Sequence, residues 1–154
     1  MSDRRGPEDA WSEFVLAVFD VNGLIIQAGE RISGPLGQSA ARWQVLGRAF
    51  QPRTVAEMAA EMGHARQSVQ RVADVLEREG LIAYRPHPTD RRTKLAELTP
   101  RGHEVLSAIY QRQVAWFAEV VSQLSEAKLR ELTVSLNQVS RALSSTITDG
   151  ERES

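Results

Sequence analysis

The chain has 154 residues, of which 42% are hydrophobic and 25% are charged, which is typical of a globular protein with one domain, or one domain and an extension. Its net charge of −1 indicates that any nucleic-acid surface must be local, and the absence of cysteine excludes disulfides, zinc–thiolate sites and thiol nucleophiles. Because no apolar run approaches roughly 18 residues and the N-terminal segment lacks the apolar core of a signal peptide, we expect a cytoplasmic protein without a membrane partner.

The first predicted element is a long amphipathic helix. Apolar residues recur at three- and four-residue spacing over residues 11–32, a pattern typical of a helix. The turn-forming sequence SGPLG at 33–37 ends this helix, and Ser39 is placed to cap the next one, which is predicted over 40–50.

A pair of short helices follows, joined by a tight turn. Thr54 and Glu57 form a capping box at the start of the first helix, and Gly63 ends that helix with a left-handed cap. The second helix is predicted over 66–80 and carries an apolar face of valine, alanine and leucine. Two short helices joined through a glycine-containing turn are typical of a helix-turn-helix.

A β-hairpin and two further helices complete the chain. The short β-compatible runs LIAYR and KLAEL flank the loop PHPTDRRT, whose prolines cannot donate ladder hydrogen bonds and therefore make it a stiff, projecting loop. A helix begins at Pro100, after the capping hydroxyl of Thr99, and another begins after Ser125 with a leucine-rich seam.

The predicted fold class is mainly α with a small β-hairpin, because a helix-turn-helix followed directly by a hairpin is a winged helix. We place the winged helix-turn-helix DNA-binding domain at 38–99 and a helical dimerisation region at 8–34 and 100–146. The long helices carry more apolar surface than so small a domain can bury, so we expect them to pack against a second copy of the chain. The polar or turn-rich ends, 1–7 and 148–154, are predicted to be flexible.

Polar side chains cluster at the start of the second helix of the pair, opposite its apolar face. From a helix in the major groove, arginine can chelate guanine and glutamine can chelate adenine, while serine suits a phosphate or a base edge. The alternative is a solvated helix with a polar outer face, but the tight helix pair and the hairpin favour DNA. The candidate recognition residues are Arg66, Gln67, Ser68, Gln70 and Arg71.

The hairpin loop concentrates positive charge, because four basic residues stand against one acid between residues 85 and 94. Arginine on a stiff loop beside a major-groove helix can reach the neighbouring minor groove. Asp90 is expected to accept hydrogen bonds from the arginine two residues on or from the turn backbone, which would fix the arginine's direction. The alternative is a charged surface turn. The candidate wing residues are Asp90, Arg91, Arg92 and Lys94.

Together these motifs resemble the MarR (multiple-antibiotic-resistance regulator) family of winged-helix transcription factors. The resemblance covers roughly residues 39–106, and its most specific part is the wing pattern Asp-x-Arg followed by a strand and LTPRG. It implies a homodimer, a recognition helix that starts near Ala65, and a wing in which Asp90 and Arg92 are the matched pair. Members of the family typically repress adjacent or divergent genes, and many release DNA on binding small aromatic or phenolic compounds.

The chain departs from the family pattern at three positions. Ala65 stands where a serine usually precedes the recognition helix, so another group, such as water or Ser68, must satisfy the first amides. His64 replaces a small aliphatic residue and is interpreted as a solvated or core-edge histidine, with a pH switch or a ligand as the alternative. Tyr84 replaces a common basic residue before the wing and removes one phosphate contact.

The effector is less constrained by the sequence. Trp11 and Trp43 could wall an aromatic pocket with Arg42 nearby to meet a carboxylate or phenolate, or both tryptophans could be core or dimer-interface residues. The scattered histidines show no metal-ligand spacing. No metal site and no cofactor are therefore expected.

The sequence as a whole predicts a homodimeric repressor of a pseudo-palindromic operator in double-stranded DNA, with half-site centres roughly 10 bp apart. The alternative is a winged-helix module that binds protein without sequence-specific DNA binding. No nucleophile–base pair, phosphate-binding glycine loop or metal cluster is evident, so we expect no enzymatic activity and assign no catalytic residue.

Overall fold

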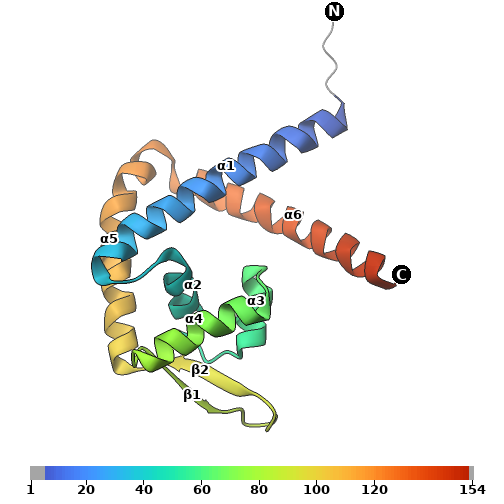
Figure 1. Cartoon of the computed structure of the whole chain (residues 1–154). Coiled ribbons are helices and arrows are strands. Elements are labelled where there is room, and N and C mark those ends of the chain that lie inside the picture. The colour runs from blue at the N-terminus through green and yellow to red at the C-terminus, as the bar shows by residue number, and fades with distance from the viewer. Residues whose placement is uncertain (1–5, 153–154) are drawn as a thin grey trace, which may run out of the picture. The chain divides into compact units, whose positions relative to one another are not determined.

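The computed structural model describes residues 6–152 and confirms the predicted class, mainly helical with one two-stranded antiparallel sheet (Figure 1). The elements are α1 (Pro7–Ser33), the 3-10 turn η1 (Gly34–Leu36), α2 (Ala40–Arg48), α3 (Val55–Met62), α4 (Arg66–Arg78), β1 (Ile82–Pro86), β2 (Lys94–Leu98), α5 (Pro100–Gln123) and α6 (Glu126–Arg152). Of the ends predicted to be flexible, residues 1–5 and 153–154 lie outside the described residues. Pro7 is the first residue of α1, and α6 extends to Arg152, so both helices continue into those ends.

The helix starts follow the predicted capping chemistry. The Ser39 hydroxyl accepts from the amide of the third residue of α2, at 3.2 Å. At α3 the Thr54 hydroxyl accepts from the Glu57 amide at 3.1 Å, and the Glu57 carboxylate accepts from the Thr54 amide at 2.7 Å. Gly63 ends α3 with φ of 63°, a left-handed conformation that side chains with a Cβ rarely adopt. Local sequence therefore determines where these helices begin and end.

The chain divides into two compact units, Met1–Gln113 and Val114–Ser154. In the first unit, the helix-turn-helix and the hairpin share one core. Its largest fully buried apolar side chains come from the end of α1, from α2, α3 and α4, from the base of the hairpin and from α5, and they are Ile32, Val45, Leu46, Met58, Val69, Leu76, Leu81, Ile82 and Ile109. These include the valine and leucine face predicted for α4, which therefore points inward and leaves the opposite face of α4 exposed.

The wing is attached to the rest of the first unit at its base. β1 and β2 pair in antiparallel register from Ile82↔Leu98 to Pro86↔Lys94, and Arg53 adds a bridge to Ala96. A Cβ added at Gly102, in the first turn of α5, would overlap the backbone oxygen of Leu81, so α5 approaches the hairpin as closely as only glycine permits.

Most of α1 is exposed. Only its C-terminal turn is buried, at Ala28, Gly29, Ile32 and Ser33. Exposed apolar side chains surround the remainder, and they include Trp11, Leu16, Phe19, Val21, Leu24, Ile25 and Ile26. Among the described residues, α1 with the turn after it is the one helix long and apolar enough to cross a membrane by length and composition, and only 11% of its most apolar window is buried.

Candidate nucleic-acid interface

The exposed face of α4 brings together four of the five residues predicted for the recognition helix. Arg66, Gln67, Gln70 and Arg71 line a surface hollow of about 360 Å³, which we call the α4 hollow. Ser68 points elsewhere, into a separate apolar pocket of about 310 Å³ that His64 and Ala65 also line. The α4 hollow therefore offers two guanidinium groups and two amides on one exposed helix face, the chemistry that reads base edges and phosphates.

The first turn of α4 has no side-chain cap. Ala65 occupies the cap position in extended conformation, and its carbonyl accepts from the amides of Ser68 at 3.0 Å and Val69 at 3.3 Å. Of the two substitutes expected, water and the Ser68 side chain, Ser68 forms no cap hydrogen bond. The amides of Arg66 and Gln67 are thus left to solvent or to an anionic ligand, and phosphate oxygens are such ligands for helix N-termini.

The wing tip is held in shape by hydrogen bonds to its backbone. As predicted, Asp90 accepts a hydrogen bond from the turn backbone: the amide of Arg92 donates to its Oδ1 at 2.9 Å. His87 contributes a second anchor that sequence reasoning missed, since its Nδ1 accepts from the amides of Asp90 at 3.0 Å and Thr89 at 3.3 Å. Both side chains therefore order the backbone that carries the two arginines.

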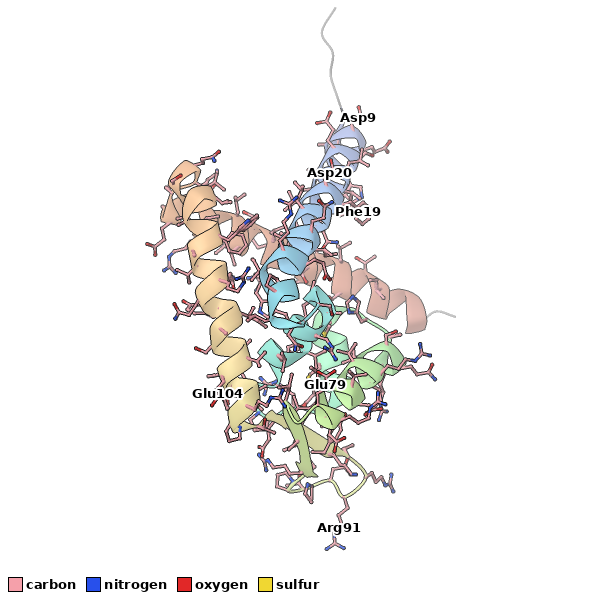
Figure 2. All side chains as sticks on the ribbon, turned by 60° about the vertical axis from the view of Figure 1, so that its left-hand side comes forward. Asp9, Phe19, Asp20, Glu79, Arg91 and Glu104 are labelled. Atoms are coloured by element: carbon pink, nitrogen blue, oxygen red, sulfur yellow. The ribbon has the colours of Figure 1, made fainter. Side chains whose placement is uncertain are left out.

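The arginine side chains at the tip remain available. Arg91 and Arg92 are exposed, and neither guanidinium forms a hydrogen bond or ion pair with the part of the chain that the structure describes. Figure 2 shows Arg91 at the end of the wing, pointing away from the hairpin. Lys94, also exposed, begins β2. Arg85 differs, because it forms an ion pair with Glu97 on the opposite strand at 2.7 Å. The free positive charge of the wing is thus concentrated toward its tip.

A polar cluster joins α4 to the wing. Gln70 of α4 donates through Nε2 to Oδ1 of Asp74 at 2.7 Å and to the hydroxyl of Tyr84 on β1 at 3.0 Å. Tyr84 donates in turn to the same Asp74 oxygen at 3.2 Å. Burial and the neighbouring Asp74 carboxylate raise the pKa of Tyr84 to about 12, above the ordinary value, at which tyrosine is already protonated at neutral pH. The spacing of Gln70 and Asp74, one helical turn, was a signal that the sequence contained.

The residues predicted to bind an effector do not form one site. Trp11 stacks on Phe14 within α1, with ring centroids 5.7 Å apart. Arg42 donates to the carbonyl of Gly37 and forms an ion pair with Glu79 at the end of α4. Only Trp43 lines a larger pocket, so the predicted combination of the three side chains is not present in this structure.

The pocket beside Trp43, which we call the α2–α5 pocket, measures about 510 Å³. It is lined by Trp43, Phe50, His103, Leu106, Ser107, Tyr110 and Gln113. Phe50 and His103 meet edge to face, with centroids 5.7 Å apart. Its volume and its mixture of aromatic walls with a few polar groups are typical of small-molecule sites.

Comparison with known proteins places these features in context. A model of the MarR family matches residues 44–93, from α2 into the wing. The chain is 34% identical over 139 residues to an uncharacterised protein of Mycobacterium tuberculosis, a match that covers 88% of this chain and 95% of the relative. The transcriptional repressor MprA of Escherichia coli is 31% identical over 97 residues, which is 63% of this chain and 53% of the repressor.

Solved structures share the fold. The transcriptional regulator BldR from Sulfolobus solfataricus superposes with a TM-score of 0.80 at 20% identity, covering 90% of this chain and 99% of BldR. CouR from Rhodococcus jostii, solved with p-coumaroyl-CoA bound, superposes with a TM-score of 0.74 at 22% identity, covering 82% of this chain and 90% of CouR.

Proposed function

The chain belongs to the MarR family of transcriptional regulators, and from this premise we propose that it is a homodimeric repressor that binds a pseudo-palindromic operator in double-stranded DNA. A member of this family is a DNA-binding transcription factor rather than an enzyme. The observation that carries the proposal is the pairing of the α4 hollow with free arginines at an ordered wing tip. The relative MprA is named a transcriptional repressor, which supports repression.

In this mechanism α4 lies in the major groove and the wing follows the adjacent minor groove. The side chains of the α4 hollow face the base edges, and the uncapped first turn of α4 meets a phosphate. Arg92 enters the minor groove, and the hydrogen bond from its backbone amide to Asp90 fixes the direction in which its side chain leaves the turn. Arg91 and Lys94 contact phosphates. The near-neutral net charge is no obstacle, since positive charge is needed only where the protein meets DNA.

The exposed apolar surface of α1 supports the homodimer. An exposed apolar surface as broad as that of α1 requires cover, and a second copy of α1 would supply it. A lipid bilayer is the less favourable partner, because Asp20 lies in the middle of the helix and a carboxylate at the centre of a membrane is costly. The proposal therefore places a soluble dimer in the cytoplasm.

We further propose that the α2–α5 pocket binds a small aromatic or phenolic compound that releases the protein from DNA. Its aromatic walls suit a ring, and His103, Tyr110 and Gln113 can hydrogen-bond a carboxylate or phenol. That CouR was solved with p-coumaroyl-CoA, which contains a phenol, supports this class of ligand. Aromatic acids that raise the melting temperature and weaken operator binding would fit; compounds that stabilise Phe50→Ala equally would exclude this pocket.

The wing provides the direct test. Arg92→Ala should weaken binding to an operator selected from random DNA by about tenfold, with an unchanged circular-dichroism spectrum. Arg85→Ala is the matched control, because Arg85 already pairs with Glu97 and should affect affinity less. Fluorescence anisotropy at two salt concentrations measures both. Wild-type affinity in Arg92→Ala would remove Arg92 from the interface, and operator affinity that does not change with salt would favour a protein-binding module over DNA.

A further inference from the structure

The amide of Gln70 is held in a closed set of hydrogen bonds at the edge of the α4 hollow. Its partners are Asp74, one turn further along α4, and Tyr84, on β1 of the wing. Gln70 also lines the hollow together with Arg66 and Arg71. The same amide thus takes part in the contact between α4 and the wing and reaches the surface proposed to face DNA.

Asp74 determines the orientation of the Gln70 side-chain amide. A carboxylate only accepts hydrogen bonds, so Gln70 must turn Nε2 toward Asp74, because the opposite orientation would bring two oxygens together. The Tyr84 hydroxyl gives its own proton to Asp74 and therefore accepts from Gln70. Nε2 carries two N–H groups and faces two acceptors, so each N–H has a partner within the chain.

We propose that this arrangement makes Gln70 an acceptor-only reader of bases, with Asp74 and Tyr84 as its positioning residues. An unrestrained glutamine recognises adenine with both ends of its amide, since it accepts from N6 and donates to N7. With both N–H groups engaged, only Oε1 is left, and it can only accept. The inference rests on the proposed function, because it requires α4 to lie in the major groove.

The consequence is a preference for a chemical class of base rather than for one base. In the major groove the amino groups that donate are N6 of adenine and N4 of cytosine, whereas guanine and thymine present acceptors. Oε1 would therefore bind adenine and cytosine and be repelled by O6 of guanine and O4 of thymine. Tyr84 stands where the family commonly has a basic residue before the wing. Instead of contacting a phosphate, it restrains the side-chain amide of Gln70.

The test compares base preference at one operator position. Gln70→Ala first identifies the position, as the one where discrimination disappears while the rest of the site is still recognised. There the wild-type protein should bind adenine and cytosine with similar affinity and guanine or thymine about tenfold more weakly. Tyr84→Phe removes one acceptor and frees an N–H for adenine N7, so it should favour adenine over cytosine. Gly47→Ala, in α2 with no atom near the added methyl group, is the control and should keep the wild-type pattern.

Two results would overturn the inference while leaving the repressor proposal standing. One is a wild-type preference for adenine over cytosine that Tyr84→Phe does not change. The other is the absence of any operator position that depends on Gln70. A wild-type protein that selects no DNA at all would refute the proposed function itself.

The hydrogen bonds can also be measured without DNA. In the amide spectrum of the free protein, both side-chain protons of Gln70 should exchange slowly, and one should lose its protection in Tyr84→Phe. Fast exchange of both protons in the wild-type protein would overturn the inference whatever the DNA result.

Discussion

The winged helix-turn-helix and α1 differ in how far each buries its apolar side chains within the chain. Val45, Met58 and Leu76 are fully buried, whereas Phe19 and Leu24 on α1 are each 65% exposed. Figure 2 labels Phe19 on α1. Contacts within the chain bury the apolar side chains of the winged helix-turn-helix, whereas those of α1 require another surface to cover them. Changes in the first should therefore lower stability at every protein concentration, and changes in the second should act through assembly.

The largest effect on stability is expected at Gly102, where the backbone of α5 lies closest to the base of the wing. Gly102→Ala places a methyl group against the Leu81 oxygen and must separate α5 from the base of the wing. We expect a loss of about 3 kcal/mol in the free energy of unfolding, measured by urea denaturation at fixed protein concentration.

Gly47→Ala is the matched control for that substitution. Gly47 lies in α2 with no atom near the added methyl group, so alanine should stabilise the helix slightly. If the two variants were equally stable, the close approach of α5 to the wing would be wrong.

The second-largest effect should be on assembly of the dimer, and it should distinguish α1 from the winged helix-turn-helix. Phe19→Lys places a charge in the exposed apolar surface of α1 and should weaken the dimer by about 2 kcal/mol, or roughly 30-fold in the dissociation constant. Sedimentation velocity over a range of concentrations measures it. Phe50→Lys makes the same exchange at an exposed position outside α1 and should leave assembly unchanged. A wild-type protein that sediments as a monomer at micromolar concentration would contradict the dimer.

The smallest effect concerns the capping box of α3. Hydrogen bonds from the Thr54 amide and hydroxyl lower the pKa of Glu57 below its usual value. Because the folded-state pKa is the lower one, ionised Glu57 contributes stability above its usual pKa, and the contribution is lost as pH falls through the lowered value. The difference in melting temperature between the wild type and Glu57→Gln should be largest at neutral pH and shrink in acid. A difference independent of pH would exclude this role for the charge.

Local patterns were the reliable part of the sequence. Capping groups such as Thr54 and Ser125, the left-handed Gly63 and the strand KLAEL all appear where they were predicted. Each of these depends on residues a few positions apart, so the physical cause is contained in a short window of sequence. The hydrogen bond from Arg92 to Asp90 belongs to the same class, since it closes a turn over two residues.

The residues predicted to bind an effector depend on contacts between elements, which short windows of sequence do not contain. Arg42 and Trp43 are neighbours in sequence, yet Arg42 turns toward Glu79 while Trp43 lines the α2–α5 pocket. The side chains that complete the pocket, His103 and Tyr110, come from α5 and are more than fifty positions away. No periodicity in the sequence reports which face of α5 meets α2, because that choice is made by packing.

The sequence by itself determined the order of the elements, their capped ends and the basic residues of α4 and the wing, since propensity, capping and charge act over short distances. Tertiary structure alone decided which of those groups remain available on the surface proposed to face DNA. Arg85 is paired across the hairpin, Gln70 is restrained by Tyr84, and Arg91 and Arg92 form no side-chain hydrogen bond or ion pair with residues 6–152. The physical reason is that hydrogen bonds and ion pairs between elements depend on where the folded backbone brings side chains together, and their distances are absent from the sequence.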